Sequence, residues 1–306
     1  MTNARFRLSG LIAAPFTPFD AQGAVALDTI PRIAGHLHAN GVTGAFVCGT
    51  TGEGSSLSFE ERCQVSAAWS RAAKGKLHVI VHVGDNSLKH SRALAHHAES
   101  IGADAIATLA PHFFKPEGIA GIVDWCAAVA SSAPKTPFYY YHMPGMTGVN
   151  CNIADLLPIA AQRIPTFAGV KFTHENLMDY TLSLAAAGDR HDILFGRDEI
   201  LLSALAVGAA GAVGSTYNYM APIFNRAIAA FAKGDIVGAR AAQLQATMVI
   251  DAMIRHGGLA AGKAIMGLIG LDCGAVRLPM RTPSADSLAK LEAELTELGY
   301  FTAVGK

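Results

Sequence analysis

The sequence predicts an α/β protein that folds as a closed (β/α)8 barrel, a TIM barrel, with a small C-terminal helical extension. Short apolar runs of four to eight residues recur along the chain, and such runs are typical of strands that are buried on both faces. Segments with helical periodicity separate the runs, which implies parallel strands joined by right-handed crossovers. The composition of 51% hydrophobic and 16% charged residues supplies the large core that this fold needs.

Eight such runs can be identified, and each is expected to contain one strand. In chain order they are Leu11–Pro18, Ala45–Gly49, Val79–Gly84, Ala105–Pro111, Phe138–Pro144, Phe167–Phe172, Ile193–Gly196 and Ala212–Thr216. Between them, Phe59–Lys74 is predicted to be a helix that begins with a Ser58-x-x-Glu61 capping box. Ser87 opens a second predicted helix, which runs to Ile101 and is closed by Gly102.

A closed barrel fits eight such units better than an open, doubly wound sheet does. The first run ends in Phe16-Thr17-Pro18-Phe19-Asp20, whereas an open sheet would be expected to have a glycine-rich phosphate loop there. We therefore assign residues 1–233 to the catalytic barrel. Residues 234–306 are assigned to a helical extension packed on it, with helices expected over 235–256, 259–270 and 284–298.

Composition argues against several classes of function. The chain has 24 lysines and arginines and 24 aspartates and glutamates, so it lacks the basic surface that nucleic acids require. The stretch Ile200–Asn225 has no charged side chain and is long enough to span a membrane. Glycines and Pro222 interrupt it, so we interpret it as a buried helix, a turn, a short strand and a loop. We expect a soluble, cytoplasmic protein that binds neither membrane nor nucleic acid.

The cysteines and histidines do not predict a metal site. The five cysteines include no CxxC pair, which favours reduced structural thiols, and the twelve histidines lack a recognisable zinc spacing.

In a (β/α)8 barrel the chemistry lies where the strands end. The second run ends in Gly49-Thr50-Thr51-Gly52-Glu53-Gly54. Its two hydroxyls and unhindered backbone N–H groups suit an anion such as a carboxylate. A plain glycine-rich turn explains the same pattern, and the residues alone do not decide between the two.

The fifth and sixth runs carry a tyrosine cluster and a lysine. Strand alternation places Tyr139 and Tyr141 on one face and Tyr140 on the other, where each could be a core residue. Lys171 lies in an otherwise apolar strand, where burial lowers the pKa of its amine and leaves a nucleophile able to form Schiff bases. The alternatives are a lysine that extends to solvent or pairs with a carboxylate. Lys263 also has apolar neighbours, but it lies on a predicted helix outside the barrel, which favours a structural role.

The last two runs end in further polar groups. Asp198 and Glu199 follow the seventh run, where they could complement a helix dipole or accept hydrogen bonds from sugar hydroxyls. Ser215 and Thr216 follow the eighth run at the same end of the barrel.

Together these residues resemble the N-acetylneuraminate lyase and dihydrodipicolinate synthase family of class I aldolases, from about residue 9 to beyond 280. The Gly49–Glu53 turn looks like the family's carboxylate-binding motif, Tyr141 matches its catalytic tyrosine, and Lys171 matches its Schiff-base lysine. Each motif alone is modest, but the three in series are highly specific.

Details within the family favour the sialic acid lyase branch. Phe138–Pro144 is similar to the lyases of animals, as are Phe195–Glu199 and Gly211–Tyr219. The synthases typically have an arginine soon after the tyrosine–proline motif, where this chain has Met146, and Pro111-His112-Phe113-Phe114-Lys115 lacks their helper tyrosine. Arg197 departs from the apolar or aromatic residue common in the lyases, so we expect a different or more acidic sugar at the outer rim.

The resemblance implies reversible aldol cleavage of N-acetylneuraminate to pyruvate and N-acetylmannosamine. Lys171 would form a Schiff base with the substrate, Tyr141 would relay a proton, and Thr50 and Thr51 would hold the carboxylate. The residues implied to hydrogen-bond the sugar hydroxyls are Thr173, Gly196, Asp198, Glu199 and Ser215. Neither a metal nor an organic cofactor is implied, and the expected assembly is a homotetramer.

Two rival functions remain open. One is a related lysine-dependent aldolase, hydratase or synthase that acts on another 2-oxo acid, such as a keto-deoxy sugar acid. The other is a non-catalytic barrel that binds a sugar acid, although the intact set of lysine, tyrosine and threonines argues against it.

Overall fold

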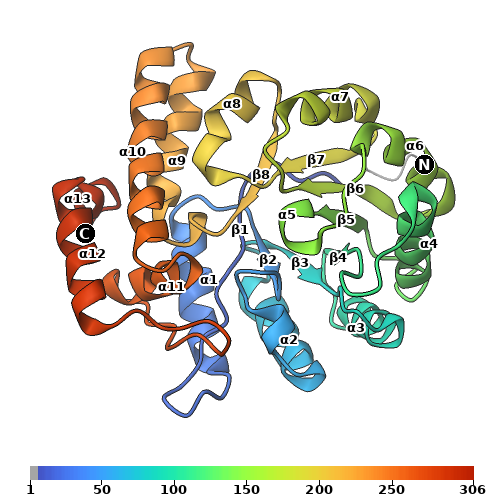
Figure 1. Cartoon of the computed structure of the whole chain (residues 1–306), viewed down its shortest axis with the longest axis horizontal. Coiled ribbons are helices and arrows are strands. Elements are labelled where there is room, and N and C mark those ends of the chain that lie inside the picture. Colours follow the sequence, from blue (N-terminus) through green and yellow to red (C-terminus); the bar gives the residue numbers. More distant parts are fainter. Residues whose placement is uncertain (1–5) are drawn as a thin grey trace.

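In the computed structural model, which describes residues 6–306, eight parallel strands form a closed barrel (Figure 1). Each strand pairs with its neighbours in chain order, and β8 pairs with β1 to close the barrel. The strands are β1 (Gly10–Ala13), β2 (Gly44–Val47), β3 (His78–His82), β4 (Ala105–Leu109), β5 (Phe138–His142), β6 (Phe167–Phe172), β7 (Asp192–Phe195) and β8 (Gly211–Gly214). The predicted fold class is therefore confirmed.

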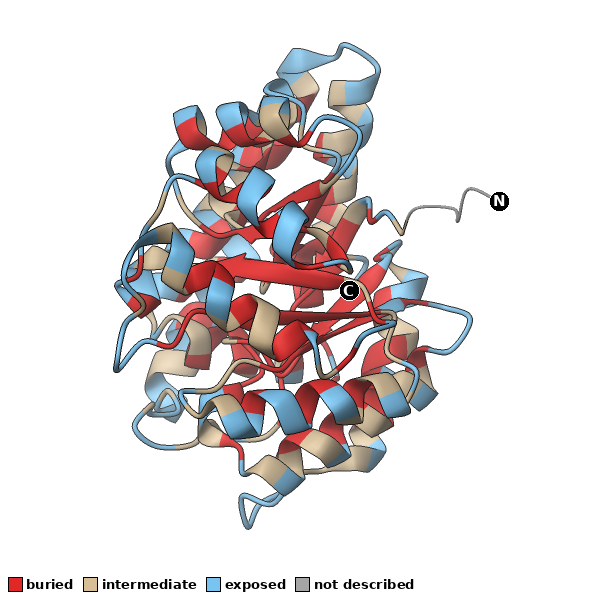
Figure 2. Cartoon of the chain, turned by 90° about the vertical axis from the view of Figure 1, so that its right-hand side faces the viewer, coloured by how far each residue is buried: buried red, intermediate tan, exposed pale blue. Residues whose placement is uncertain are grey.

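Helices surround the barrel, so that the strands are buried and the outer helix faces are exposed (Figure 2). The helices of the β/α units are α1 (Ile30–Ala39), α2 (Phe59–Ala73), α3 (Leu88–Ser100), α4 (Gly118–Ala130), α5 (Pro144–Thr147), α6 (Ile153–Arg163), α7 (Leu177–Ala187), α8 (Leu201–Ala206) and α9 (Tyr217–Ala232). Short 3-10 helices lie at η1 (Leu27–Thr29), η2 (Gly54–Ser56) and η3 (Asp198–Ile200). The extension contains α10 (Ile236–Arg255), α11 (Leu259–Leu268), α12 (Ala285–Glu297) and α13 (Tyr300–Ala303).

The predicted capping signals are present in the structure. Ser58 and Glu61 form a reciprocal capping box at the start of α2. Ser87 accepts a hydrogen bond from the N–H of His90 at the start of α3. These side chains satisfy N–H groups that have no partner within the helix, which fixes where each helix begins.

The segment after β8 differs from its prediction as a loop, because α9 begins at Tyr217 and contains Pro222. A proline inside a helix removes one hydrogen bond and leaves the carbonyl four residues earlier without its usual donor. That carbonyl belongs to Asn218, and it accepts a hydrogen bond of 3.1 Å from Nε2 of His36 on α1. A neighbouring helix therefore supplies the donor that the proline lacks.

The tyrosines of β5 alternate as expected. Tyr139 and Tyr141 belong to the small cluster inside the barrel, whereas Tyr140 belongs to the larger core between the strands and the helices. The inner cluster is made up of Leu8, Ile12, Ala14, Phe46, Ile80, Ala105, Ala107, Tyr139, Tyr141, Leu194 and Val213.

The C-terminal extension packs through α10 on α9, α8 and η3 (Figure 1). Tyr300 donates a buried hydrogen bond of 3.0 Å to the carbonyl of Tyr219, which ties α13 to α9. Residues 1–5 of the proposed barrel unit lie outside the described residues, and the division at residue 233 stays a prediction. None of the helices within residues 6–306 has the length and apolarity needed to cross a membrane.

Candidate active site

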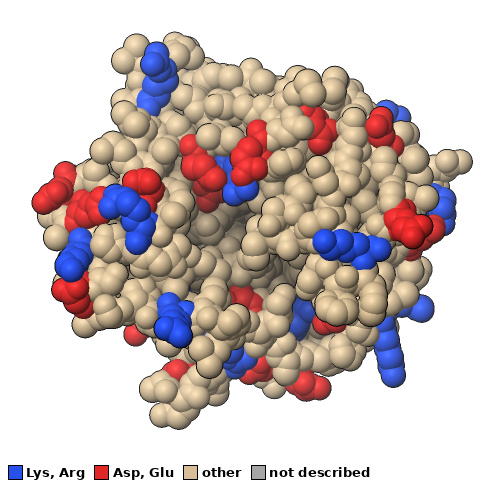
Figure 3. All heavy atoms as spheres, in the orientation of Figure 1, with Lys and Arg blue, Asp and Glu red and all other residues tan. Residues whose placement is uncertain are grey.

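A cavity of about 670 Å³ opens where the strands end, and Figure 3 shows it as the hollow at the centre of this face. Every residue that the sequence singled out for catalysis or substrate binding lines it. These residues are Thr50, Thr51, Tyr141, Lys171, Thr173, Gly196, Asp198, Glu199 and Ser215. They come from five different strand ends, and the closed barrel brings them together.

Lys171 lies on β6, next to Tyr141 of β5 and Leu194 of β7 in the strand register. The residue is only 4% exposed. Its Nζ lies 3.7 Å from the ring centre of Phe46 and 4.0 Å from that of Tyr141. Burial lowers the pKa of Lys171 to about 7, while the Asp198 carboxylate opposes this shift. A large share of the amine is therefore uncharged, and so nucleophilic, near neutral pH.

The phenol of Tyr141 points to the same part of the cavity. Its oxygen lies 3.4 Å from Oγ1 of Thr50, and it donates a hydrogen bond of 2.9 Å to Sδ of Met143. Burial raises the pKa of Tyr141, and the hydroxyls of Thr50 and Thr173 partly offset this. The phenol stays protonated at neutral pH, so it can pass a proton between a substrate and the Thr50 hydroxyl.

The turn after β2 is held in a shape that few sequences adopt. Cys48 and Glu53 flank it with φ angles of 57° and 54°, in the left-handed region that non-glycine residues rarely occupy. A Cβ atom on Gly54 would lie 2.0 Å from the carbonyl oxygen of Cys48, so only glycine fits there. The closing hydrogen bonds use the N–H groups of Glu53 and Gly54, whereas those of Thr50 and Thr51 donate to no backbone carbonyl of the described residues and can serve an anion.

Asp198 is buried beside β8. Its Oδ2 accepts hydrogen bonds from the N–H (2.9 Å) and the hydroxyl (2.7 Å) of Thr216. Its Oδ1 occupies the space that a Cβ atom on Gly214 would need, since the two would be 1.9 Å apart. Burial raises the pKa of Asp198, and the Thr216 hydrogen bonds oppose this. The carboxylate is thus fixed in place, with Oδ1 as its remaining acceptor.

Thr173 and Gly196 are in direct contact. A Cβ atom on Gly196 would lie 2.1 Å from Oγ1 of Thr173, so glycine at this position leaves room for the hydroxyl. The Thr173 hydroxyl lowers the pKa of the Tyr141 phenol, although its oxygen makes no hydrogen bond of normal geometry within the described residues. Ser215 lies half-buried after β8, the strand next to β7. These groups give the cavity polar contacts beyond Lys171.

The outer wall carries a group of charged residues. Arg197 pairs with Glu175, and its Nη1 lies 3.5 Å from Oε1 of Glu199. Nδ1 of His174 lies 3.0 Å from Oε2 of Glu175. Two carboxylates therefore outnumber the one guanidinium, so the paired Arg197 does not give this wall a net positive charge that would favour a more acidic sugar.

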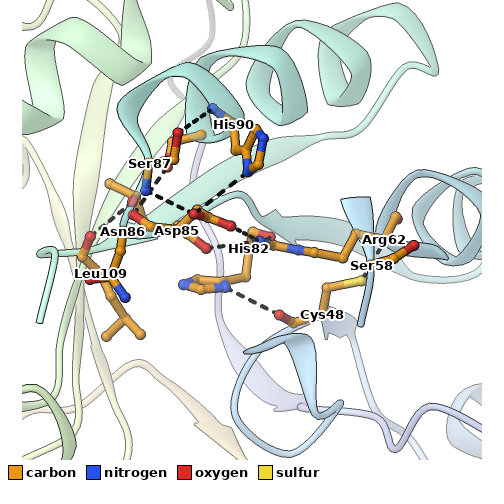
Figure 4. A network of polar contacts seen from close by, with 12 residues as sticks. Cys48, Ser58, Arg62, His82, Asp85, Asn86, Ser87, His90 and Leu109 are labelled. Atoms are coloured by element: carbon orange, nitrogen blue, oxygen red, sulfur yellow. Dashed lines mark hydrogen bonds and ion pairs between the residues drawn. The ribbon is translucent and has the colours of Figure 1, made fainter. Parts of the chain in front are cut away.

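Arg62 is a buried charge that the sequence prediction missed. It lies on α2 and donates hydrogen bonds to the carbonyls of Gly84 (2.9 Å) and His82 (2.7 Å). It also forms an ion pair of 3.7 Å with Asp85, and Figure 4 shows its side chain reaching toward His82 and Asp85. Arg62 thereby fixes the end of β3 against α2. Its position in an amphipathic helix gave no signal, because arginine is common on such helices.

His82 was also missed as a cavity residue. Its Nδ1 lies 3.1 Å from the carbonyl oxygen of Cys48, so Nδ1 carries the proton (Figure 4). Burial, together with the charges of Arg62 and Lys171, lowers the pKa of His82 well below its ordinary value. The ring is therefore neutral, and it packs edge-on against Tyr141 with ring centres 5.8 Å apart. The sequence did contain a signal for this position. His82 lies two residues after Ile80 on β3, so both side chains face the inside of the barrel.

Residues 6–306 contain no group of three or more histidines, cysteines, aspartates or glutamates placed to hold a metal ion.

Comparisons with known proteins agree with this geometry. The model of the dihydrodipicolinate synthetase family matches residues 7–298. The chain is 42% identical over 302 residues to an N-acetylneuraminate lyase from Mus musculus, which covers 97% of this chain and 94% of the relative. It is 44% identical over 299 residues to one from Gallus gallus, with 96% and 97% covered.

Solved structures show the same similarity. The N-acetylneuraminate lyase of Proteus mirabilis superposes with a TM-score of 0.94 at 41% identity, covering 96% of this chain and 100% of that one. A dihydrodipicolinate synthase from Bacillus anthracis superposes with a TM-score of 0.88 at 26% identity, covering 94% and 97%.

Proposed function

The chain belongs to the dihydrodipicolinate synthetase family, and we propose that it is a Schiff-base aldolase that cleaves N-acetylneuraminate reversibly to pyruvate and N-acetylmannosamine. This makes it a carbon–carbon lyase. The observation that carries the proposal is the buried amine of Lys171, whose pKa is lowered to about 7 and which lies 4.0 Å from the ring centre of Tyr141. Relatives at 42–44% identity that are named N-acetylneuraminate lyase supply the substrate.

The proposed reaction begins when Nζ of Lys171 attacks the C2 ketone of the open-chain sugar. Water leaves, and the resulting protonated imine draws electrons from the substrate. The C3–C4 bond then breaks, its electron pair forms an enamine, and the C4 hydroxyl loses its proton as it becomes the aldehyde of N-acetylmannosamine. Protonation of C3 and hydrolysis of the imine release pyruvate and restore the amine.

Tyr141 is proposed to relay the proton of the C4 hydroxyl. A phenol is a poor base on its own because its ordinary pKa is about 10. The Thr50 hydroxyl, 3.4 Å from the phenol oxygen, extends the path for the proton toward the turn after β2. The substrate carboxylate, bound at that turn, would complete the relay.

The other cavity residues are proposed to position the substrate. Thr50 and Thr51 would hold the carboxylate with their hydroxyls and backbone N–H groups, as suits an anion at such a turn. The residues proposed to hydrogen-bond the sugar hydroxyls are Thr173, Gly196, Asp198, Glu199 and Ser215. The fixed Oδ1 of Asp198 supports this role, because an immobile acceptor distinguishes hydroxyl positions.

Further properties are proposed with the function. The chemistry needs neither a metal nor an organic cofactor, because the imine on Lys171 is itself the electron sink. The partners are the sugar acid and pyruvate, the assembly is a homotetramer, and the location is cytoplasmic. All five cysteines are unpaired, which agrees with a reducing compartment.

A panel of substrates tests the proposal, with pyruvate release as the measurement. N-acetylneuraminate should be cleaved with a kcat/KM at least about tenfold above that of keto-deoxy sugar acids that lack the acetylated amine, a difference of about 1.4 kcal/mol in transition-state binding. A preference for the shorter acids would instead identify a related aldolase. If no substrate of the panel released pyruvate, the result would favour a non-catalytic barrel that binds a sugar acid.

A further inference from the structure

We propose that the buried ion pair of Glu53 and Lys263 is a positioning device that holds the carboxylate-binding turn in its anion-binding shape. Glu53 ends the turn after β2, whereas Lys263 lies on α11 of the C-terminal extension. The extension already lines the cavity with residues such as Met253 and Gly262, and this pair, whose Lys263 does not line the cavity, links it in addition to the turn. The role rests on the function proposed above.

The pair is dry and close. The side chains of Glu53 and Lys263 are 0% and 1% exposed, and Nζ of Lys263 lies 2.8 Å from Oε1 of Glu53. The second oxygen, Oε2, accepts a hydrogen bond of 2.8 Å from the N–H of Arg277. Lys263 makes a second hydrogen bond, of 2.9 Å, to the carbonyl of Ala275 and lies over the ring of Phe19. Both charges therefore have partners on several sides.

Stability alone does not account for such a pair. Taking two charges out of water costs about as much as their attraction returns, and apolar replacements of similar volume are often as stable. The conformation of Glu53 supplies another reason. Its φ of 54° costs on the order of 1–3 kcal/mol and persists only where the surroundings impose it. Contacts from α11 and from Arg277 impose it here.

The backbone conformation of Glu53 is linked to the catalytic Tyr141 through Thr50. The N–H of Glu53 donates a hydrogen bond of 3.1 Å to the carbonyl of Thr50, which closes the turn. The hydroxyl of Thr50 lies 3.4 Å from the phenol oxygen of Tyr141. Displacement of Glu53 would therefore shift both the carboxylate site and the partner of the phenol.

Charge gives the pair a second effect. Glu53 lies at the wall of a cavity that is proposed to bind a carboxylate, and an unpaired negative charge there would repel the substrate. Lys263 neutralises it. Loss of Lys263 should consequently harm carboxylate binding more than loss of the Glu53 charge.

The experiment compares two carbonyl compounds that Lys171 can trap under borohydride, pyruvate and the carboxylate-free ketone hydroxyacetone. In the full-length protein, Lys263→Met and Glu53→Gln should each raise the half-saturating pyruvate concentration, by about tenfold or more for Lys263→Met and less for Glu53→Gln. Trapping of hydroxyacetone should change less than about twofold, because it does not use the turn. A purely structural pair would change both compounds alike.

A double variant and a control keep the test decisive. Glu53→Gln/Lys263→Met has no unpaired buried charge, so it carries the test if the single variants do not fold, and it should still bind pyruvate weakly. Arg255→Met breaks the Arg255–Glu294 pair of the same extension away from the cavity, and it should trap pyruvate as the parent does. Parent-like pyruvate saturation in the folded double variant would overturn the proposal. A parent protein that traps no pyruvate would refute the aldolase function instead.

Discussion

At the scale of single residues, the site depends on a lysine whose charged form is disfavoured. Lys171 lies against the rings of Phe46 and Tyr141, and it forms no ion pair with a carboxylate of residues 6–306, so burial dominates the shift of its pKa. The rings would stabilise an ammonium ion only modestly, since a cation–π contact contributes about 0.5–2 kcal/mol. The free amine that imine formation requires is thereby present near neutral pH.

The pH dependence of turnover follows from this pKa. Below pH 7 most of the amine is protonated and cannot attack a ketone, so kcat/KM should rise with pH through about 7 and then level off. The raised pKa of Tyr141 keeps the phenol protonated throughout this range. A profile measured with N-acetylneuraminate checks this, and a rate that falls as pH rises through 7 would contradict the assignment.

Some of these residues could be predicted from the sequence and others could not. Lys171 stands out because it interrupts an apolar strand, and strand alternation alone places Tyr141 inside the barrel. His82 is fixed in the cavity wall by its contact with the carbonyl of Cys48. Glu53 is held by Lys263, which lies 210 positions later in the chain. Such pairings between distant parts of a chain leave no local pattern.

At the scale of elements, glycines let neighbouring strands approach closely below the site. Gly169 is the clearest case, because a Cβ atom there would lie 2.0 Å from the backbone carbonyl oxygen of Asp192 on β7. A backbone atom cannot move aside as the end of a side chain can. Gly169 therefore sets the spacing of β6 and β7 two residues before Lys171.

Gly169→Ala should destabilise the fold by about 3 kcal/mol, as overpacking against a fixed backbone does, and should lower activity because Lys171 moves with β6. Gly35→Ala is the matched control, since nothing lies within 4 Å of the added Cβ atom and the position is within α1. It should be stabilising by about 0.5–1 kcal/mol. Denaturant unfolding measures both changes, and equal effects of the two variants would refute the close-packing argument.

Element order and type could be predicted, but element ends could not. The run Leu11–Pro18 yields only β1, Gly10–Ala13, because its later residues form the rim of the cavity while staying apolar. The segment of α9 around Pro222 was predicted as a loop, because a proline removes a helical hydrogen bond. The replacement donor is His36 on another helix, which the local sequence does not show. Hydrophobicity reports burial, and both strands and rim loops are buried here.

At the scale of the whole molecule, one helix of the extension exposes an apolar stripe. Val237, Leu244 and Met248 lie along one face of α10 and are 79%, 60% and 44% exposed. Their spacings of seven and four residues correspond to about two turns and one turn, which places them on one side of the helix. The proposed homotetramer would give this face a partner, since apolar patches of this kind mark association surfaces.

Leu244→Glu should weaken that assembly, because a charge would be buried against apolar neighbours. By sedimentation, the parent should behave as four chains of 31.9 kDa each, and the variant as smaller species. Leu182→Glu on α7, where the parent side chain is 49% exposed, is the control and should leave the assembly unchanged. A parent chain that sediments as a monomer would refute the tetramer.

The central claim is that Lys171 forms an imine with a 2-oxo acid, and borohydride trapping tests it most directly. The full-length protein, incubated with pyruvate and borohydride and then digested, should carry one reduced pyruvate adduct on Lys171, and N-acetylneuraminate should produce the same adduct. Lys263 is an internal control, because it is equally buried but paired with Glu53, and it should stay unmodified. An unmodified Lys171 in folded protein, or an adduct on another lysine, would contradict the account.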